Sequence, residues 1–342
     1  MALSNGGPGA RRDATARRLL STAISVGAAL ALAGNGRAAQ DAPAAPARPP
    51  ALIALARVTP DARIALALGP GAVAVDDGLW VAAGRGLVRI DAKTNAVGAP
   101  VAVSAPVCAS LVVAFGSVWA PLCDAGTVAR VDVKTQAVTT PLTLAVADAT
   151  GRIATAVGSV WVASDGRGVV SRVDPDTNDV VAELYVARGP SAVAFGEEAL
   201  WITSREGNVV TRVNPHTNVV VDTVTVGPAP GRVAVGEGAV WTLNRGDGSV
   251  SRIDPKSTKV VATIPIEGAA AGEIAAGEGS VWVSAPGLPL VRIDPRTNRA
   301  VQRFTGDGGG AVIVAHGSVW VAMGPALTWR LDPALLAAMR PE

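Results

Sequence analysis

Residues 232–266 read RVAVGEGAVWTLNRGDGSVSRIDPKSTKVVATIPI, and this stretch decides the fold. It contains four short runs rich in β-branched residues, separated by the turn signals Glu237-Gly238, Gly246-Asp247-Gly248 and Asp254-Pro255. Glycine supplies the positive φ that a tight hairpin needs, and proline fixes the φ of a turn while it removes a strand donor. Four antiparallel strands in about 40 residues are typical of one blade of a β-propeller.

The same pattern recurs along the chain, with one tryptophan in each copy. Successive tryptophans are 38 to 42 residues apart, and a fixed period of this length indicates a repeat architecture. About eleven residues after each tryptophan come Arg, an aliphatic residue and Asp or Asn, as in Arg252-Ile253-Asp254. The seven tryptophans are Trp80, Trp119, Trp161, Trp201, Trp241, Trp282 and Trp320. We therefore predict an all-β fold, a seven-bladed β-propeller with four antiparallel strands in each blade.

The two ends of the repeat region complement each other. Residues 62–68 read as a strand ahead of the first copy, whereas the seventh copy turns at Asp332-Pro333 before a fourth strand can form. Asp as a cap and Pro at the first helical position favour the start of a helix. We expect residues 62–68 to pair with residues 328–332 and to close the ring. The propeller then spans 61–333, and residues 334–342 form a short tail or helix.

Residues 1–38 have the features of a secretory signal peptide. Arg17-Arg18 precede an apolar run at 19–33 that is too short to span a bilayer, and small residues follow around Gly36. The arginine pair partly matches a twin-arginine signal, and the export route stays open. Residues 39–60 are rich in Pro and Ala, so we expect an extended linker. The mature chain is expected to be periplasmic or secreted, with no transmembrane span.

The charge balance bears on the partners of the mature chain. The full chain has 30 Lys and Arg against 28 Asp and Glu. Removal of residues 1–38 takes away five Arg and one Asp, which leaves 25 positive and 27 negative side chains. A chain without net positive charge or a basic run lacks the footprint of a nucleic-acid binder. Nucleic acid is therefore not an expected partner, and we expect a monomer.

The repeated residues are interpreted as structural. Seven equivalent tryptophans suit packing between neighbouring blade sheets better than a ligand platform, because a ligand site needs residues that break the repeat. The Asp-Pro-x-Thr-Asn sequence at 174–178 and 294–298 suits a turn whose Asn adopts a left-handed conformation. The Arg two residues before the Asp lies on the same strand face, and it either bridges that Asp or reaches the adjacent blade.

The pattern from Val281-Trp282-Val283 to the Arg-Ile-Asp-Pro-x-Thr-Asn segment resembles the 40-residue YVTN-type repeat of YncE-like proteins, over residues 62–333. The resemblance implies an exported seven-bladed propeller without a common reaction. The chain is more distantly similar to streptogramin B (virginiamycin B) lyases, whose chemistry implies His and Glu around a magnesium site. That site is not matched, because the only histidines, His216 and His316, lie at turn positions where other copies have other polar residues.

Candidate binding residues follow from strand direction. The interblade turns and the turns between second and third strands must emerge on one face of the disc. Arginines gather there in blades three to five, and they favour a carboxylate, a phosphate or an acidic peptide. The alternative is a set of solvated loop charges that acidic neighbours partly neutralise. The candidate ligand-binding residues are Arg167, Arg188, Arg205, Arg232, Asn244 and Arg245.

Cys108 and Cys123 are the only cysteines, and thiols of exported chains tend to become oxidised. Alignment of the second copy on its tryptophan places the hairpin turn at Phe115-Gly116, so residues paired across this hairpin have numbers that sum to 231. The two cysteines meet this condition, and we predict a disulfide between them.

No motif for catalysis, metal ligation or cofactor binding occurs, so we expect neither a metal nor a cofactor. The function that fits best is a binding or scaffold protein of the cell envelope, with a small or peptidic anion held at the channel mouth. Two alternatives stay open. One is a metal-assisted lyase or lactone hydrolase, and the other is an accessory protein of an exported redox system. Enzymatic activity is not the favoured reading.

Overall fold

The computed structural model describes residues 49–66, 73–75, 78–83, 85–108, 110–144 and 152–341. All of them belong to one compact unit, which runs from Ala47 to Glu342. The expected signal peptide at 1–38 and most of the expected linker lie outside the described residues. Among the described helices, none combines the length and the apolar character needed to cross a bilayer.

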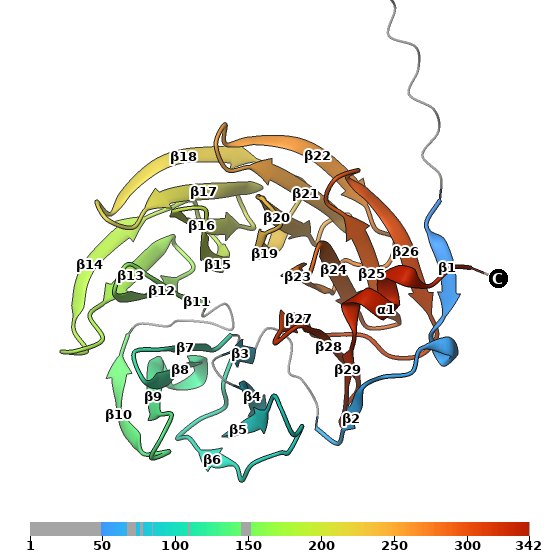
Figure 1. The fold of residues 1–342 in the computed structure, drawn as a ribbon. Coiled ribbons are helices and arrows are strands. Elements are labelled where there is room, and N and C mark those ends of the chain that lie inside the picture. The colour runs from blue at the N-terminus through green and yellow to red at the C-terminus, as the bar shows by residue number, and fades with distance from the viewer. Residues whose placement is uncertain are drawn as a thin grey trace, which may run out of the picture. The chain divides into compact units, whose positions relative to one another are not determined.

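Seven small sheets form a ring, and the first strand of each repeat, β3, β7, β11, β15, β19, β23 or β27, lies innermost (Figure 1). Blade 1 comprises β3 (Val73–Val75), β4 (Gly78–Ala83), β5 (Gly86–Asp91) and β6 (Val101–Ala102). Blade 2 comprises β7 (Val112–Ala114), β8 (Ser117–Leu122), β9 (Thr127–Asp132) and β10 (Val138–Thr143), with the short helix η2 (Cys123–Ala125) after β8. Blade 3 comprises β11 (Ile153–Ala156), β12 (Ser159–Asp165), β13 (Val169–Val173) and β14 (Val180–Tyr185).

The second half of the ring repeats this order. Blade 4 comprises β15 (Pro190–Gly196), β16 (Ala199–Ser204), β17 (Val209–Asn214) and β18 (Val219–Thr225). Blade 5 comprises β19 (Pro230–Gly236), β20 (Ala239–Asn244), β21 (Ser249–Asp254) and β22 (Lys259–Pro265). Blade 6 comprises β23 (Glu273–Gly277), β24 (Ser280–Ala285), β25 (Leu288–Asp294) and β26 (Arg299–Thr305). The seven-bladed propeller that the repeats predicted is confirmed.

Blade 7 is built from both ends of the chain. Its inner strands are β27 (Val312–Ala315), β28 (Ser318–Gly324) and β29 (Leu327–Leu331), and its outer strand is β2 (Ala62–Ile64). Strand β2 runs antiparallel to β29, with Ala62 opposite Arg330 and Ile64 opposite Thr328. The predicted ring closure is therefore confirmed, with a shorter strand than expected. After β29, helix α1 (Pro333–Ala338) begins at Asp332, whose side chain accepts from the backbone N–H groups of Ala334 and Leu335.

The expected linker at 39–60 is wrong at its C-terminal end. Strand β1 (Ala51–Ala54) pairs in parallel with β26, and the short helix η1 (Leu55–Arg57) follows it. Blade 6 therefore has five strands instead of four. The prolines end at Pro50, so each residue of β1 keeps its backbone donor, and Ile53 buries all but 1% of its surface against the core.

The tryptophans pack in the core between neighbouring blades. All seven are at most 1% exposed, and six donate the indole N–H to a carbonyl five residues earlier, as Trp241 does to Gly236. In five blades the repeated Arg lies over the indole, with Arg252 5.1 Å from the ring centre of Trp241. The interpretation of these residues as packing residues agrees with this burial.

The repeated Arg reaches the adjacent blade, which answers a question that the sequence left open. Arg252 donates through Nη1 to the carbonyl of Pro295 and to Oδ1 of Asn298, both in the next blade. Arg330 closes the circle in the same way, with contacts to the carbonyl of Ala92 and to Asn95 in blade 1. The Asn residues hold a left-handed φ, for example 56° at Asn298.

The hairpin of blade 2 has the predicted register. Val112 pairs with Trp119, Val113 with Val118 and Ala114 with Ser117, so the residue numbers of each pair sum to 231. Cys108 and Cys123 form a disulfide with their Cα atoms 5.6 Å apart. They are not a hydrogen-bonded strand pair, because the N–H of Cys108 donates to the carbonyl of Pro121. The chain leaves the strand at this point and enters η2.

Candidate anion-binding site at the channel mouth

A cavity of about 210 Å³ lies where the innermost strands of six blades converge. Its walls include the residues nine positions before the tryptophan in blades 2 to 7. All six occupy equivalent repeat positions within two residues of the start of an innermost strand, so their side chains form one tier of the channel. These residues are Ser110, Arg152, Ala192, Arg232, Glu273 and Ala311.

Arg152 is the most deeply buried arginine in this tier, with 8% of its surface exposed. Its Nε donates to the carbonyl of Ser191 in the next blade at 2.9 Å. The pKa of Arg152 is lowered to about 9, chiefly by burial and then by the positive charge of Arg232, whereas Glu273 opposes the shift. The guanidinium is therefore held where its own charge is costly.

Arg232 and Glu273 form an ion pair across neighbouring blades. The Arg232 Nε donates to Glu273 Oε2 at 2.5 Å, and the side chains are only 11% and 7% exposed. The other carboxylate oxygen of Glu273, Oε1, is buried and has no hydrogen-bond partner among the described residues. The pair is joined by one hydrogen bond, so Oε1 of Glu273 remains available to accept a hydrogen bond from a donor in the cavity.

Two more arginines come from the turns between second and third strands. Arg245 follows β20 and Arg205 follows β16, and the backbone N–H of each donates to the preceding interblade turn, at Ala229 and Gly189. A Cβ atom at Gly231 would lie 2.4 Å from Cδ of Arg245, so the glycine lets this side chain cross the backbone. Burial lowers the pKa of Arg245, and the charges of Arg232 and Arg205 add to that effect while Glu273 opposes it.

Arg245 also has an unused donor. Its Nε is buried without a hydrogen-bond partner within the described ranges. Arg152, Arg205, Arg232 and Arg245 thus lie near enough to perturb one another electrostatically, with Glu273 as the acidic neighbour among the described residues.

Three of the expected ligand-binding residues lie apart from this cluster. Arg167 is exposed and pairs with Asp165 on its own turn. Arg188 is exposed and lies 3.9 Å from Glu206. Asn244 is fully buried, and its amide donates to the hydroxyl groups of Ser249 and Ser251 inside blade 5. The structure therefore brings Arg205, Arg232 and Arg245 together, and it places the other three elsewhere.

The sequence interpretation missed Glu273 and left Arg152 out of the candidate set. The available signal was the position nine residues before each tryptophan, which is small in blades 4 and 7 and charged in blades 3, 5 and 6. Small and charged residues at one repeat position indicate a lined channel, since a packed position would keep one size and polarity.

Both histidines lie far from this tier in the repeat. His216 is in the turn between β17 and β18, and His316 is in the turn between β27 and β28 with Nε2 3.4 Å from the carbonyl of Gly78. Strand direction places both turns on the face opposite the arginines. Among the described residues, no three His, Cys, Asp or Glu side chains gather in a way that would hold a metal ion.

Fold and geometry define a seven-bladed β-propeller with a cationic channel mouth. No protein-family model matches the chain, and no curated protein matches its sequence. Similar solved structures include virginiamycin B lyase from Staphylococcus aureus, with 18% identity, a TM-score of 0.67 and coverage of 79% of this chain and 98% of that chain. A catalytically inactive histidine-to-alanine variant of that lyase with quinupristin has 19% identity, a TM-score of 0.66 and the same coverage.

BamB from Moraxella catarrhalis is also similar, with 14% identity, a TM-score of 0.57 and coverage of 76% of this chain and 82% of that chain. Identities this low establish a shared fold and no shared activity. The distant similarity to the lyases is supported at the level of the fold. The resemblance to YncE-like proteins is not confirmed by these comparisons.

Proposed function

We propose that this protein is an exported binding protein of the cell envelope that holds an anionic group, a carboxylate or a phosphate, at the channel mouth. The observation that carries the proposal is the clustering of four arginines around one glutamate at and beside the cavity. The side chains leave a local formal charge of +3. Burial of a charge costs several kcal/mol when no opposite charge compensates it, and a bound anion would supply that compensation.

The size of the cavity limits what enters it. A whole drug-sized ligand needs roughly 300–1,000 Å³, whereas this cavity has about 210 Å³. It would therefore take the anionic end of a ligand, such as a terminal carboxylate of a peptide. The rest of the ligand would lie over the turns that carry Arg205 and Arg245, where guanidinium groups can contact two oxygens at once.

Two other functions remain candidates. A lyase is supported by the fold shared with virginiamycin B lyase, but both histidines of this chain lie in turns on the opposite face. A scaffold or accessory role in the envelope needs no catalytic residues and is compatible with the propeller fold, which BamB shares. Incubation of the purified protein with quinupristin separates the first candidate from simple binding, because a lyase would convert it.

The binding proposal is tested by calorimetry with phosphate, citrate and a tetraglutamate peptide as probes. We expect Arg245→Gln to weaken binding about tenfold, the equivalent of one charge-assisted contact of about 1.4 kcal/mol. The double variant Arg232→Gln/Glu273→Gln replaces the ion pair with a neutral pair that can still form a hydrogen bond. Both residues are changed together because a single change would leave the other charge buried and unpaired. Arg167→Gln is the matched control, because that arginine is exposed and paired outside the cavity. Binding that is absent, or unchanged in the Arg245 variant, would contradict the proposal.

A further inference from the structure

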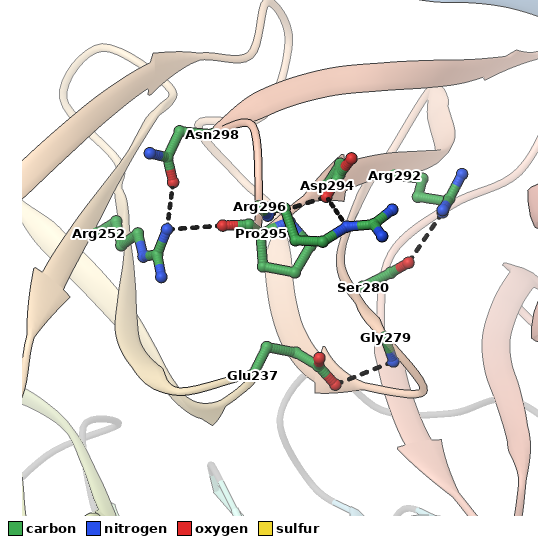
Figure 2. Close-up of polar contacts among 9 residues, drawn as sticks. All are labelled: Glu237, Arg252, Gly279, Ser280, Arg292, Asp294, Pro295, Arg296 and Asn298. Atoms are coloured by element: carbon green, nitrogen blue, oxygen red, sulfur yellow. Dashed lines mark hydrogen bonds and ion pairs between the residues drawn. The ribbon is translucent and has the colours of Figure 1, made fainter.

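The junction between blades 6 and 7 lacks the arginine clamp that recurs elsewhere in the ring. In blades 2, 3, 5 and 7 the repeated Arg donates Nη1 to a turn carbonyl and to an Asn in the next blade. Figure 2 shows this arrangement for Arg252, Pro295 and Asn298. Arg292 of blade 6 has no such turn to reach, because α1 replaces it in blade 7.

The helix preserves the backbone of the missing turn but not its acceptor. Asn298 donates its backbone N–H to Asp294, and Leu336 does the same to Asp332, so Leu336 occupies the position of the Asn. Leu336 is buried and apolar, with 2% of its surface exposed. It cannot accept a hydrogen bond through its side chain.

Arg292 keeps the Nε–serine contact that the repeated arginines of blades 2, 3 and 7 also make, and Gln302 of its own blade takes the place of the missing turn. Its Nε donates to the hydroxyl of Ser280 at 2.8 Å, as Figure 2 shows. Its Nη1 donates to Oε1 of Gln302 at 3.1 Å, and the amide of Gln302 donates in turn to the carbonyls of Leu336 and Met339. The guanidinium is thus fixed in direction by two side chains, which is a requirement for a binding group.

Arg292 forms part of the wall of a cavity of about 660 Å³ between α1 and the outer strands β1 and β26. The charged groups of that wall are Arg292, Arg299, Arg340 and Asp294, which give a formal charge of +2. Burial lowers the pKa of Arg292, Asp294 opposes the shift, and the positive charges of Arg296 and Arg340 add to it. The cavity therefore favours a negatively charged occupant.

The remaining wall is mainly apolar. It includes Pro50, Leu52, Val301, Met339 and Pro341, and Leu52 leaves 59% of its surface exposed. The volume lies within the range of about 300–1,000 Å³ that is usual for small-molecule sites, in which apolar walls surround a few directed polar groups. An apolar body with one anionic end matches both parts of this wall.

We propose that the cavity between α1, β1 and β26 is a second binding site, which takes a small apolar carboxylic acid with its carboxylate at Arg292 and Arg299. The chain segment that forms it includes the N-terminal strand and the C-terminal helix, so the site exists only at this junction of the ring. It shares no wall residue with the channel mouth, so the proposal of a second site is independent of the proposed function.

The test uses 11-(dansylamino)undecanoic acid as a fluorescent probe and its methyl ester as the uncharged match. We expect the acid to bind at micromolar concentration and the ester to bind at least tenfold more weakly. Arg292→Gln and Arg299→Glu are each expected to weaken the acid about tenfold. Arg299 is exposed on an outer strand, so the Arg299 variant remains informative if loss of Arg292 loosens α1. Thermal unfolding of each variant checks the fold.

The matched control is Arg303→Gln on the same strand, whose guanidinium contacts the carbonyl of Glu267 away from the cavity. It should bind the acid as the wild type does. Equal binding of acid and ester, wild-type affinity in the Arg292 and Arg299 variants, or no binding of the acid at 1 mM would each overturn the proposal. A tenfold loss in both variants with an unchanged control supports it.

Discussion

The contact between Arg252 and Asn298 is expected to couple blades 5 and 6 measurably. Arg252 donates to Asn298 Oδ1 and to the carbonyl of Pro295, each at 2.6 Å, and lies 5.1 Å from the centre of the Trp241 ring. Hydrogen bonds to a charged group contribute about 1.5–3 kcal/mol each, and a stacked cation contributes about 0.5–1 kcal/mol at an exposed site. Because Arg252 is half-buried, we take the lower ends and expect Arg252→Met to cost about 3.5 kcal/mol.

The partner substitution is Asn298→Gly, because Asn298 has a φ of 56° and glycine adopts this conformation without strain. It removes one of the two hydrogen bonds, so we expect it to cost about 1.5 kcal/mol. The double variant loses that bond once, so it should cost about 3.5 to 4 kcal/mol instead of the additive sum of about 5 kcal/mol. The expected coupling energy is about 1 to 1.5 kcal/mol.

The assay is urea unfolding followed by both tryptophan fluorescence and far-UV circular dichroism, since coincident curves are needed for a two-state free energy. The matched control combines Arg252→Met with Asn218→Gly. Asn218 of blade 4 accepts from Arg172 of blade 3, so it shares no hydrogen bond with Arg252. These two changes should add within about 0.5 kcal/mol. A coupling of the same small size for Arg252 and Asn298 would refute the clamp as a source of cohesion between blades.

Two further predictions concern ring closure and the disulfide. Ile64→Ala should lower the unfolding free energy by about 2–4 kcal/mol in urea titrations, because Ile64 is 3% exposed and packs in the cluster that includes Trp320. The control is Arg63→Ala at the exposed neighbouring position on β2, which should cost about 1 kcal/mol or less. Equal costs for the two variants would contradict closure by β2. Denatured, unreduced protein from the periplasm should show no thiol that reacts with maleimide, and the double variant Cys108→Ser/Cys123→Ser should lose about 3 kcal/mol, whereas two reactive thiols would refute the bridge.

The repeat made most of the fold predictable. Turn chemistry acts locally, and each copy carries the same tryptophan, Arg and Asp at a constant spacing, so the number of blades and the positions of the turns follow from the sequence. The register of the second hairpin also follows, because a two-residue turn sets the pairing of both strands. Ring closure was predictable since an extra strand at one end matched a missing strand at the other.

Departures from the repeat were decided by the tertiary structure. Strand β1 pairs in parallel with β26, more than 240 residues away along the chain, and no local pattern specifies that partner. Glu273 joins Arg232 from a position 41 residues away, and Asn244 turns into the blade instead of the mouth. Arg292 differs from its repeat equivalents only because the next blade ends in a helix. Local turn and strand preferences act within a few residues, whereas these contacts depend on the closed ring, which brings distant segments together.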